Sequence, residues 1–162
     1  MSAEIETRSS APGVLHAKVR GVIDEHTDFS PLLPASVATL HVDTSEVFRI
    51  NSMGVKAWLD WVHSVERAGS RLVLYDCPPV LVGQLNMIAG FAGRLGRVAS
   101  VRAPWVCEAC GHGIVERIDL THGPVAIPQT KPCPRCSNAM EFEEVGEVYL
   151  DFLRVPKTPA TR

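Results

Sequence analysis

Apolar and polar residues alternate or form short runs at several places in the first hundred residues. From Val14 to Arg20 the two kinds alternate along the chain, which predicts a strand with one buried face. Apolar runs at 38–42, 71–75 and 98–101 predict three further, shorter strands.

Two stretches between these strands have helical spacing instead. Apolar residues recur every three or four positions from Gly54 to Ala68, so we expect a helix that Ser52 caps and Gly69 ends. A second helix is expected to begin at a pair of prolines and to extend to about Phe91. The resulting order of strand, strand, helix, strand, helix, strand predicts an α/β fold, a mixed sheet with helices packed on it.

Composition and charge limit the classes of protein to which this chain can belong. Its 162 residues suit one domain, or one small domain with an appendage, and are too few for a large multi-domain enzyme. The net charge of −2 disfavours a strongly basic nucleic-acid binder. The N-terminus is acidic and has no apolar core, and the longest uncharged stretch is broken by prolines. We therefore expect a cytoplasmic protein with no secretory signal and no membrane span.

The charge is distributed unevenly between two parts of the chain. Residues 1–104 hold ten basic and ten acidic side chains, whereas residues 105–155 hold four basic and eight acidic ones. All four paired cysteines lie in the acidic part. We expect a boundary near Pro104, with an α/β body at 13–104 and a cysteine-bearing module at 105–155. The polar residues 1–12 and 156–162 are expected to be flexible tails.

Two Cys-x-x-Cys pairs carry the most specific chemical signal in the sequence. Cys107 and Cys110 form the first pair, and Cys133 and Cys136 form the second. Two such turns present four thiolates to one tetrahedral ion, which predicts a structural Zn²⁺ site with no position open to substrate. Apolar stretches around the pairs predict the short strands of a small β zinc ribbon.

Other chemistry is possible at the same cysteines. A disulfide pairing requires an oxidising compartment, which the absence of a secretory signal disfavours. A redox dithiol needs only one pair, so the second would be superfluous. His112 follows Cys110 closely and is an alternative ligand, although four cysteines already suffice. Cys77 is a lone thiol and is interpreted as a buried apolar residue.

Four stretches of the body resemble a STAS domain, the fold of bacterial anti-sigma-factor antagonists and of sulphate-transporter tails. They are Gly21-Val-Ile-Asp24, Ala38-Thr-Leu-His-Val-Asp43, Ile50-Asn-Ser-Met-Gly54 and Arg71-Leu-Val-Leu-Tyr-Asp-Cys-Pro-Pro79. The resemblance implies a STAS-like domain at 13–104 that binds a regulatory protein: a serine-kinase anti-sigma factor, a phosphatase or another regulator. The ribbon would replace the family's usual C-terminal helix.

The resemblance breaks at the residue that carries the family's switch. The loop before the first long helix usually reads Asp-Ser-Ser-Gly or Asp-Ser-Thr-Gly, and a kinase phosphorylates the third position. Here the loop is Asn51, Ser52, Met53 and Gly54, so the third position has no hydroxyl group. Phosphorylation of Ser52 is an alternative, because a phosphate suits a helix N-terminus, but Ser52 fits better as the cap.

The sequence also offers a candidate contact residue on the first predicted helix. Trp61 lies toward the edge of the apolar face that Trp58 occupies, so it is either a core residue or a partly exposed interface anchor. Asp24, Glu25 and His26 follow a strand and are interpreted as surface loop residues.

No nucleotide-binding motif or nucleophile motif is present, so we expect no catalytic residues and no enzyme. The main hypothesis is a non-enzymatic signalling adapter that docks a protein partner through Asn51, Ser52, Met53, Gly54 and Trp61. One alternative is a non-catalytic subunit of a larger machine, such as a STAS protein bound to a transporter ATPase. A ribbon-type nucleic-acid binder is the third hypothesis, disfavoured because the ribbon is the acidic part.

Overall fold

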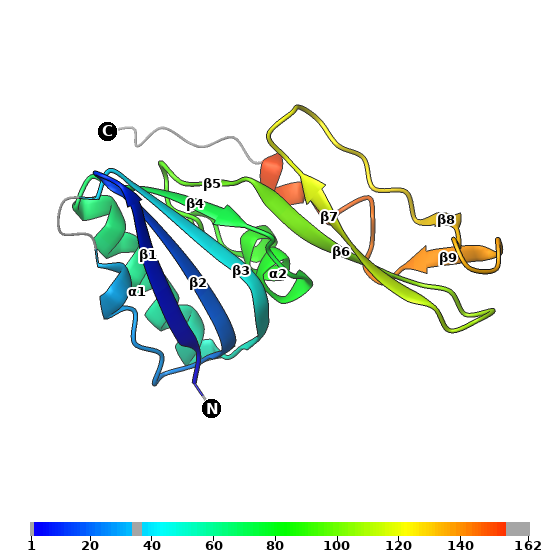
Figure 1. The fold of residues 1–162 in the computed structure, drawn as a ribbon, viewed down its shortest axis with the longest axis horizontal. Coiled ribbons are helices and arrows are strands. Elements are labelled where there is room, and N and C mark those ends of the chain that lie inside the picture. Colours follow the sequence, from blue (N-terminus) through cyan, green and yellow to red (C-terminus); the bar gives the residue numbers. More distant parts are fainter. Residues whose placement is uncertain (1, 34–36, 155–162) are drawn as a thin grey trace.

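The computed structural model describes residues 2–33 and 37–154, which form two β-sheets and two α-helices (Figure 1). The first sheet contains β1 (Glu4–Ala11), β2 (Val14–Ile23), β3 (Thr39–Ile50), β4 (Arg71–Tyr75) and β5 (Arg97–Val98), in that order. The second has the order β7 (Gly113–Asp119), β6 (Ser100–Val106), β9 (Ala139–Phe142), β8 (Thr130–Pro132). The helices are α1 (Ser52–Arg67) and α2 (Pro79–Met87), with 3₁₀ turns η1 (Ser30–Leu32) and η2 (Asp151–Leu153). The α/β class with a mixed sheet is confirmed.

The N-terminal segment is a strand and not the flexible tail that was expected at 1–12. β1 pairs antiparallel with β2, with Ile5 opposite Val19 and Arg8 opposite His16. Gly13 forms the tight turn between them with a φ of +75°, a conformation that favours glycine. The prediction was wrong because β1 is almost entirely exposed, so its polar sequence shows no buried face. The tail expected at 156–162 lies outside the described residues.

Both helices pack on one face of the first sheet and bury a shared core. The Trp58 side chain on α1 is fully buried, and its indole N–H donates to the carbonyl oxygen of Phe91 at 2.8 Å. From β2 and β3, residues such as Val19, Leu40 and Val42 fill the same core. β3 runs on to Ile50, well past its expected end, because it goes on pairing with β2, where Ile50 lies opposite Ile23.

The second sheet begins earlier than the boundary predicted near Pro104. β6 is continuous from Ser100 to Val106, and its whole length pairs with β7, so Pro104 lies within a strand. Its partner there is Val115. β8, at Thr130–Pro132, is one of the short strands that were expected around the cysteine pairs and leads directly into the second pair. A hydrophobic pattern shows which residues are buried, but not where one sheet ends and the next begins.

Hydrogen bonds join the two sheets along β6. The Cys77 amide donates to the Ser100 carbonyl oxygen at 3.1 Å, and the Arg102 amide donates to the Cys77 carbonyl oxygen at 2.8 Å. The segment after β9 returns to α2, where the Asn86 amide group donates to the Tyr149 carbonyl oxygen at 3.1 Å. The second sheet therefore extends from the body as an arm anchored at one end (Figure 1). Neither α-helix of the described chain is long and apolar enough to cross a membrane.

Candidate metal centre and helix-capping loop

The four cysteines of the two predicted pairs converge at one point of the second sheet. All four Sγ atoms lie within 4.8 Å of one another, with 3.5 Å between Cys107 and Cys136 and 3.7 Å between Cys110 and Cys133. A tetrahedral ion bound at about 2.3 Å from each sulfur places the sulfurs about 3.8 Å apart. The cluster therefore has the dimensions of a tetrathiolate metal site and is consistent with zinc.

Two matching turns hold the thiols in this arrangement. In the first turn the Gly111 amide donates to the Cys107 carbonyl oxygen at 2.7 Å, and in the second the Ser137 amide donates to the Cys133 carbonyl oxygen at 2.9 Å. The residue after each pair has a positive φ, +74° at Gly111 and +67° at Ser137. The first turn connects β6 to β7 and the second connects β8 to β9, so pairing of the two hairpins in one sheet brings the turns together.

The surroundings of the Cys136 sulfur favour the thiolate, the form that binds metal. The Asn138 backbone amide and side chain donate to Cys136 and lower the pKa of its thiol to about 6. Cys107 and Cys133 are buried and Cys110 is exposed, so one side of the cluster faces the core and the other faces solvent. His112 accepts from the Cys107 amide through its backbone oxygen, and within the described chain the four cysteines alone form the cluster.

The loop before α1 is capped by a different residue from the one predicted. Asn51, not Ser52, is the N-cap: its side-chain oxygen accepts from the Gly54 amide at 2.7 Å. Ser52 is the first helical residue and is exposed. The Asn51 side chain also donates to the Glu25 carboxylate at 3.1 Å, and its backbone amide donates to the Ile23 carbonyl oxygen at 3.2 Å. The expected cap was wrong by one position because amide and hydroxyl side chains are both good caps, and only backbone geometry selects one.

Gly54 is required by close packing. A Cβ atom at this position would lie 2.1 Å from the Ile23 carbonyl oxygen and 2.9 Å from the Asp24 amide nitrogen. The first turn of α1 therefore rests directly on the end of β2. Asp24 in turn is held by Ser2, whose hydroxyl donates to its carboxylate at 2.7 Å, so this end of the sheet is tightly fixed.

Met53 and Trp61, the two remaining residues of the predicted docking surface, have opposite environments. Met53 is 53% exposed, and Phe48 near the end of β3 is 72% exposed. A shallow cavity of about 460 Å³ between Ile50, Asn51, Ser52 and the α2 residue Gln84 lies beside the loop. Trp61 is 3% exposed, its ring stacks on Phe29 at 5.1 Å, and its indole N–H donates to the Leu32 carbonyl oxygen at 3.1 Å. The interface-anchor interpretation of Trp61 is wrong, because η1 and the loop before it cover the edge of α1.

Cys77 is buried, as its interpretation from sequence required. Desolvation raises the pKa of its thiol to about 12, and the Thr44 hydroxyl lies 3.6 Å from its sulfur. The thiol is therefore protonated and shielded, a poor nucleophile.

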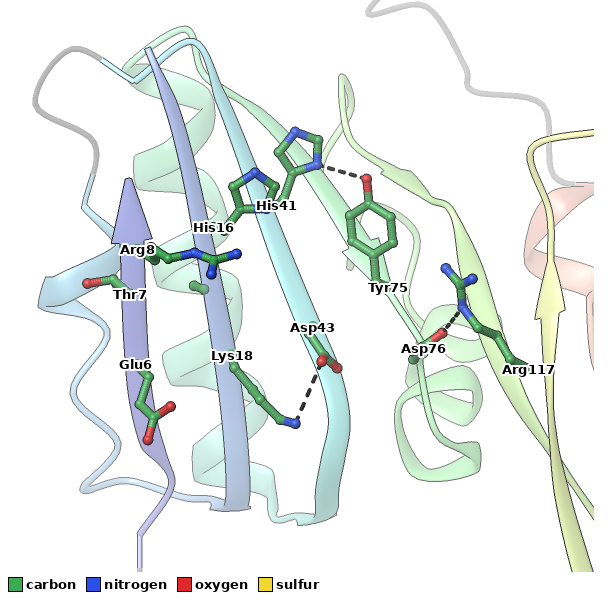
Figure 2. Close-up of a pocket in the computed structure, with 11 residues that line it drawn as sticks. Glu6, Thr7, Arg8, His16, Lys18, His41, Asp43, Tyr75, Asp76 and Arg117 are labelled. Atoms are coloured by element: carbon green, nitrogen blue, oxygen red, sulfur yellow. Dashed lines mark hydrogen bonds and ion pairs between the residues drawn. The ribbon is translucent and has the colours of Figure 1, made fainter. Parts of the chain in front are cut away.

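Sequence reasoning missed a polar hollow on the face of the first sheet opposite the helices (Figure 2). It has a volume of about 690 Å³ and is lined by side chains from β1, β2, β3, β4 and β7, among them Arg8, His16, His41, Tyr75 and Arg117. The alternation of β2 places His16 and Lys18 on one face, which is the only sequence signal of this site. Which other side chains line the hollow depends on how the strands pair, and the sequence does not show this.

Neither a model of a known protein family nor the sequence of any curated protein matches this chain.

Proposed function

We propose that the protein is a non-enzymatic signalling adapter, a STAS-like domain extended by a structural zinc ribbon, which binds a regulatory protein partner. The observation that carries the proposal is the exposed Met53 side chain at the tightly held N-terminus of α1. By the resemblance, the partner is a serine-kinase anti-sigma factor, a phosphatase or a related regulator.

The rigidity of the loop supports a docking role. Asn51 and Gly54 fix the first turn of α1 against β2, so Met53 is presented without a large loss of loop freedom on binding. Methionine and phenylalanine are enriched at the centres of protein interfaces, and Met53 and Phe48 are both exposed near this end of the sheet. Isolated exposed apolar residues are common, so what distinguishes Met53 is its exposure on a rigidly held loop.

Met53 also makes the proposed adapter independent of phosphorylation at the family's usual position. The thioether of Met53 cannot accept a phosphoryl group. The neighbouring Ser52 does carry a hydroxyl group, but it is one residue before the position that is phosphorylated in the family. The protein would bind its partner constitutively through this surface. In the proposed arrangement the four thiols hold one Zn²⁺ that stabilises the ribbon, with no ligand position left for a substrate.

The test is affinity capture from cells that express the protein, with zinc-loaded full-length bait. We expect wild-type bait to retain a kinase, phosphatase or related regulator that then binds the purified bait directly. Met53→Asp should weaken that binding at least tenfold, because it places a charge at the centre of the surface. Val115→Asp is the matched control, since Val115 is similarly exposed, at 52%, but lies on β7 of the ribbon.

Three outcomes would overturn the proposal. They are equal binding by Met53→Asp and wild type, loss of binding with Val115→Asp alone, and recovery of nucleic acid without a protein partner. Recovery of a transporter ATPase in place of a regulator would select the alternative role as a subunit of a larger machine.

A further inference from the structure

The open face of the first sheet carries its polar side chains in transverse rows set by strand register. One row runs Arg8, His16, His41, Val73, Arg97, with one residue from each strand β1 to β5. The next row runs Glu6, Lys18, Asp43, Tyr75. Because residues paired across a sheet point to the same face, each row is one line of neighbouring side chains. Figure 2 shows Arg8, His16 and His41 of the first row and the four residues of the second.

The second row and its neighbours are neutralised by ion pairs within the sheet. Lys18 lies 2.5 Å from the Glu46 carboxylate and 3.8 Å from the Asp43 carboxylate. The Arg20 guanidinium lies 3.1 Å from the Glu6 carboxylate. This half of the face therefore satisfies its own charges.

The first row contains no carboxylate. Arg8 is exposed, and among the described residues neither its side chain nor that of Arg97 has an ion-pair or hydrogen-bond partner. Figure 2 shows the Arg8 side chain directed across toward β2, the strand that carries His16. The first row therefore keeps arginine N–H donors without a partner, whereas the charges of the second row are paired with one another.

The two histidines between the arginines are held in a fixed arrangement. Their rings stack with centroids 4.7 Å apart and an interplanar angle of 11°. His41 Nδ1 lies 2.8 Å from the Tyr75 hydroxyl, which fixes that ring, while within the described chain the His16 ring nitrogens have no hydrogen-bond partner. Two parallel imidazoles and a guanidinium thus border one end of the 690 Å³ hollow.

We propose that this hollow binds the phosphate group of a small molecule, held by Arg8, His16 and His41. Guanidinium groups donate in pairs to phosphate oxygens, and imidazole N–H groups add further donors. The rest of the hollow offers Tyr75, Asp43 and Asp76, which suit hydroxyl or amino groups on the body of an organic phosphate. The site is independent of the proposed docking surface, because Met53 belongs to α1 on the helical side of the sheet.

The shape and charge of the hollow favour a small ligand over a nucleic-acid strand. Beyond Tyr75, Arg117 is paired with Asp76 at 2.6 Å and borders the hollow on the side of the ribbon. Glu6, Asp43 and Glu46 lie on the same side of the cationic row as Tyr75. A long polyanion would have to cross these carboxylates, whereas one phosphate group need not.

The experiment is isothermal titration calorimetry of the zinc-loaded full chain with inorganic phosphate and, separately, with ribose 5-phosphate. We expect saturable binding at one site per chain, weakened at least tenfold by Arg8→Ala and by the double variant His16→Gln, His41→Gln. Arg20→Ala is the matched control, because Arg20 lies on the same face but is already paired with Glu6 and Glu46. Arg8 is exposed on an edge strand, so its replacement leaves the fold intact, which circular dichroism would verify.

The two probes distinguish the source of the phosphate. Tighter binding of ribose 5-phosphate identifies an organic phosphate as the ligand, and equal binding identifies free phosphate. The proposal is overturned if neither probe binds at millimolar concentration, or if Arg20→Ala weakens probe binding as much as Arg8→Ala does. It is also overturned if a single-stranded oligonucleotide binds this face and the two small probes do not.

Discussion

The Asn51 side-chain oxygen accepts a hydrogen bond from the Gly54 backbone amide at 2.7 Å and so caps α1. This bond satisfies one of the amides at the start of the helix that have no partner within it. Replacing Asn51 by Ala should therefore lower the free energy of unfolding by about 1 kcal/mol. Ser52→Ala, the control, should change it by less than about 0.5 kcal/mol, because an exposed first helical residue makes no cap. Urea denaturation measures both, and a larger effect at Ser52 would contradict the assignment.

The burial of Trp61 leads to a second prediction. Its ring packs on Phe29 and Trp58, and its N–H is bonded to the Leu32 carbonyl oxygen. Trp61→Ala should lower the free energy of unfolding by about 3–5 kcal/mol, as large core truncations do. Thermal and urea denaturation would show it as a large fall in melting temperature. A nearly unchanged melting temperature would contradict the assignment of Trp61 to the core.

The contrast between Cys77 and the other cysteines can be tested by counting reactive thiols. Elemental analysis should find about one zinc per chain. A chelator should release the metal and expose the four thiols of the cluster to a thiol reagent. Cys77 should react only after denaturation, because it is buried and its pKa is raised to about 12. Five reactive thiols in the native chelated protein would show that metal loss unfolds the whole chain and not the second sheet alone.

The connection between the two sheets depends on Ser100. Its hydroxyl donates to the Asp76 carboxylate at 2.7 Å and accepts from the Asp76 amide at 2.8 Å, and the residue is fully buried. Ser100→Ala removes this hydrogen-bond partner from the backbone amide and the carboxylate of Asp76. It should lower the free energy of unfolding by about 1–3 kcal/mol. Arg117→Ala should cost at most about 1 kcal/mol, since the Arg117 side of its ion pair with Asp76 is about half exposed. Equilibrium unfolding of the two variants tests this order.

His41 should make stability depend on pH. Burial, followed by the charges of His16 and Arg97, lowers its pKa from the ordinary value of 6.5. Between 6.5 and the lower folded-state value the unfolded chain binds more protons than the folded chain, so stability falls as pH falls through this window. His41→Gln should reduce this slope. Urea denaturation of zinc-loaded wild type and variant between pH 5 and 7.5 provides the comparison, and parallel curves would refute it.

Local patterns predicted much of this fold. The periodicity of 54–68 indicated α1, and the alternation after Val14 indicated β2, because each pattern reports which side chains face a core. β1 was missed because both of its faces are largely exposed, and Trp61 was misplaced because its covering residues come from a loop thirty positions earlier. Helical spacing places a residue at the edge of a face but does not reveal what covers that edge.

The sequence alone determined the four-cysteine cluster, since two short turns with fixed spacing set the thiol positions locally once they meet. It did not determine the row of Arg8, His16 and His41. Those residues come from three strands, and a shift of one residue in any pairing would move its side chain to the opposite face. Register is set by the packing of the whole sheet against α1 and α2, so only the tertiary structure decided which polar side chains share the open face.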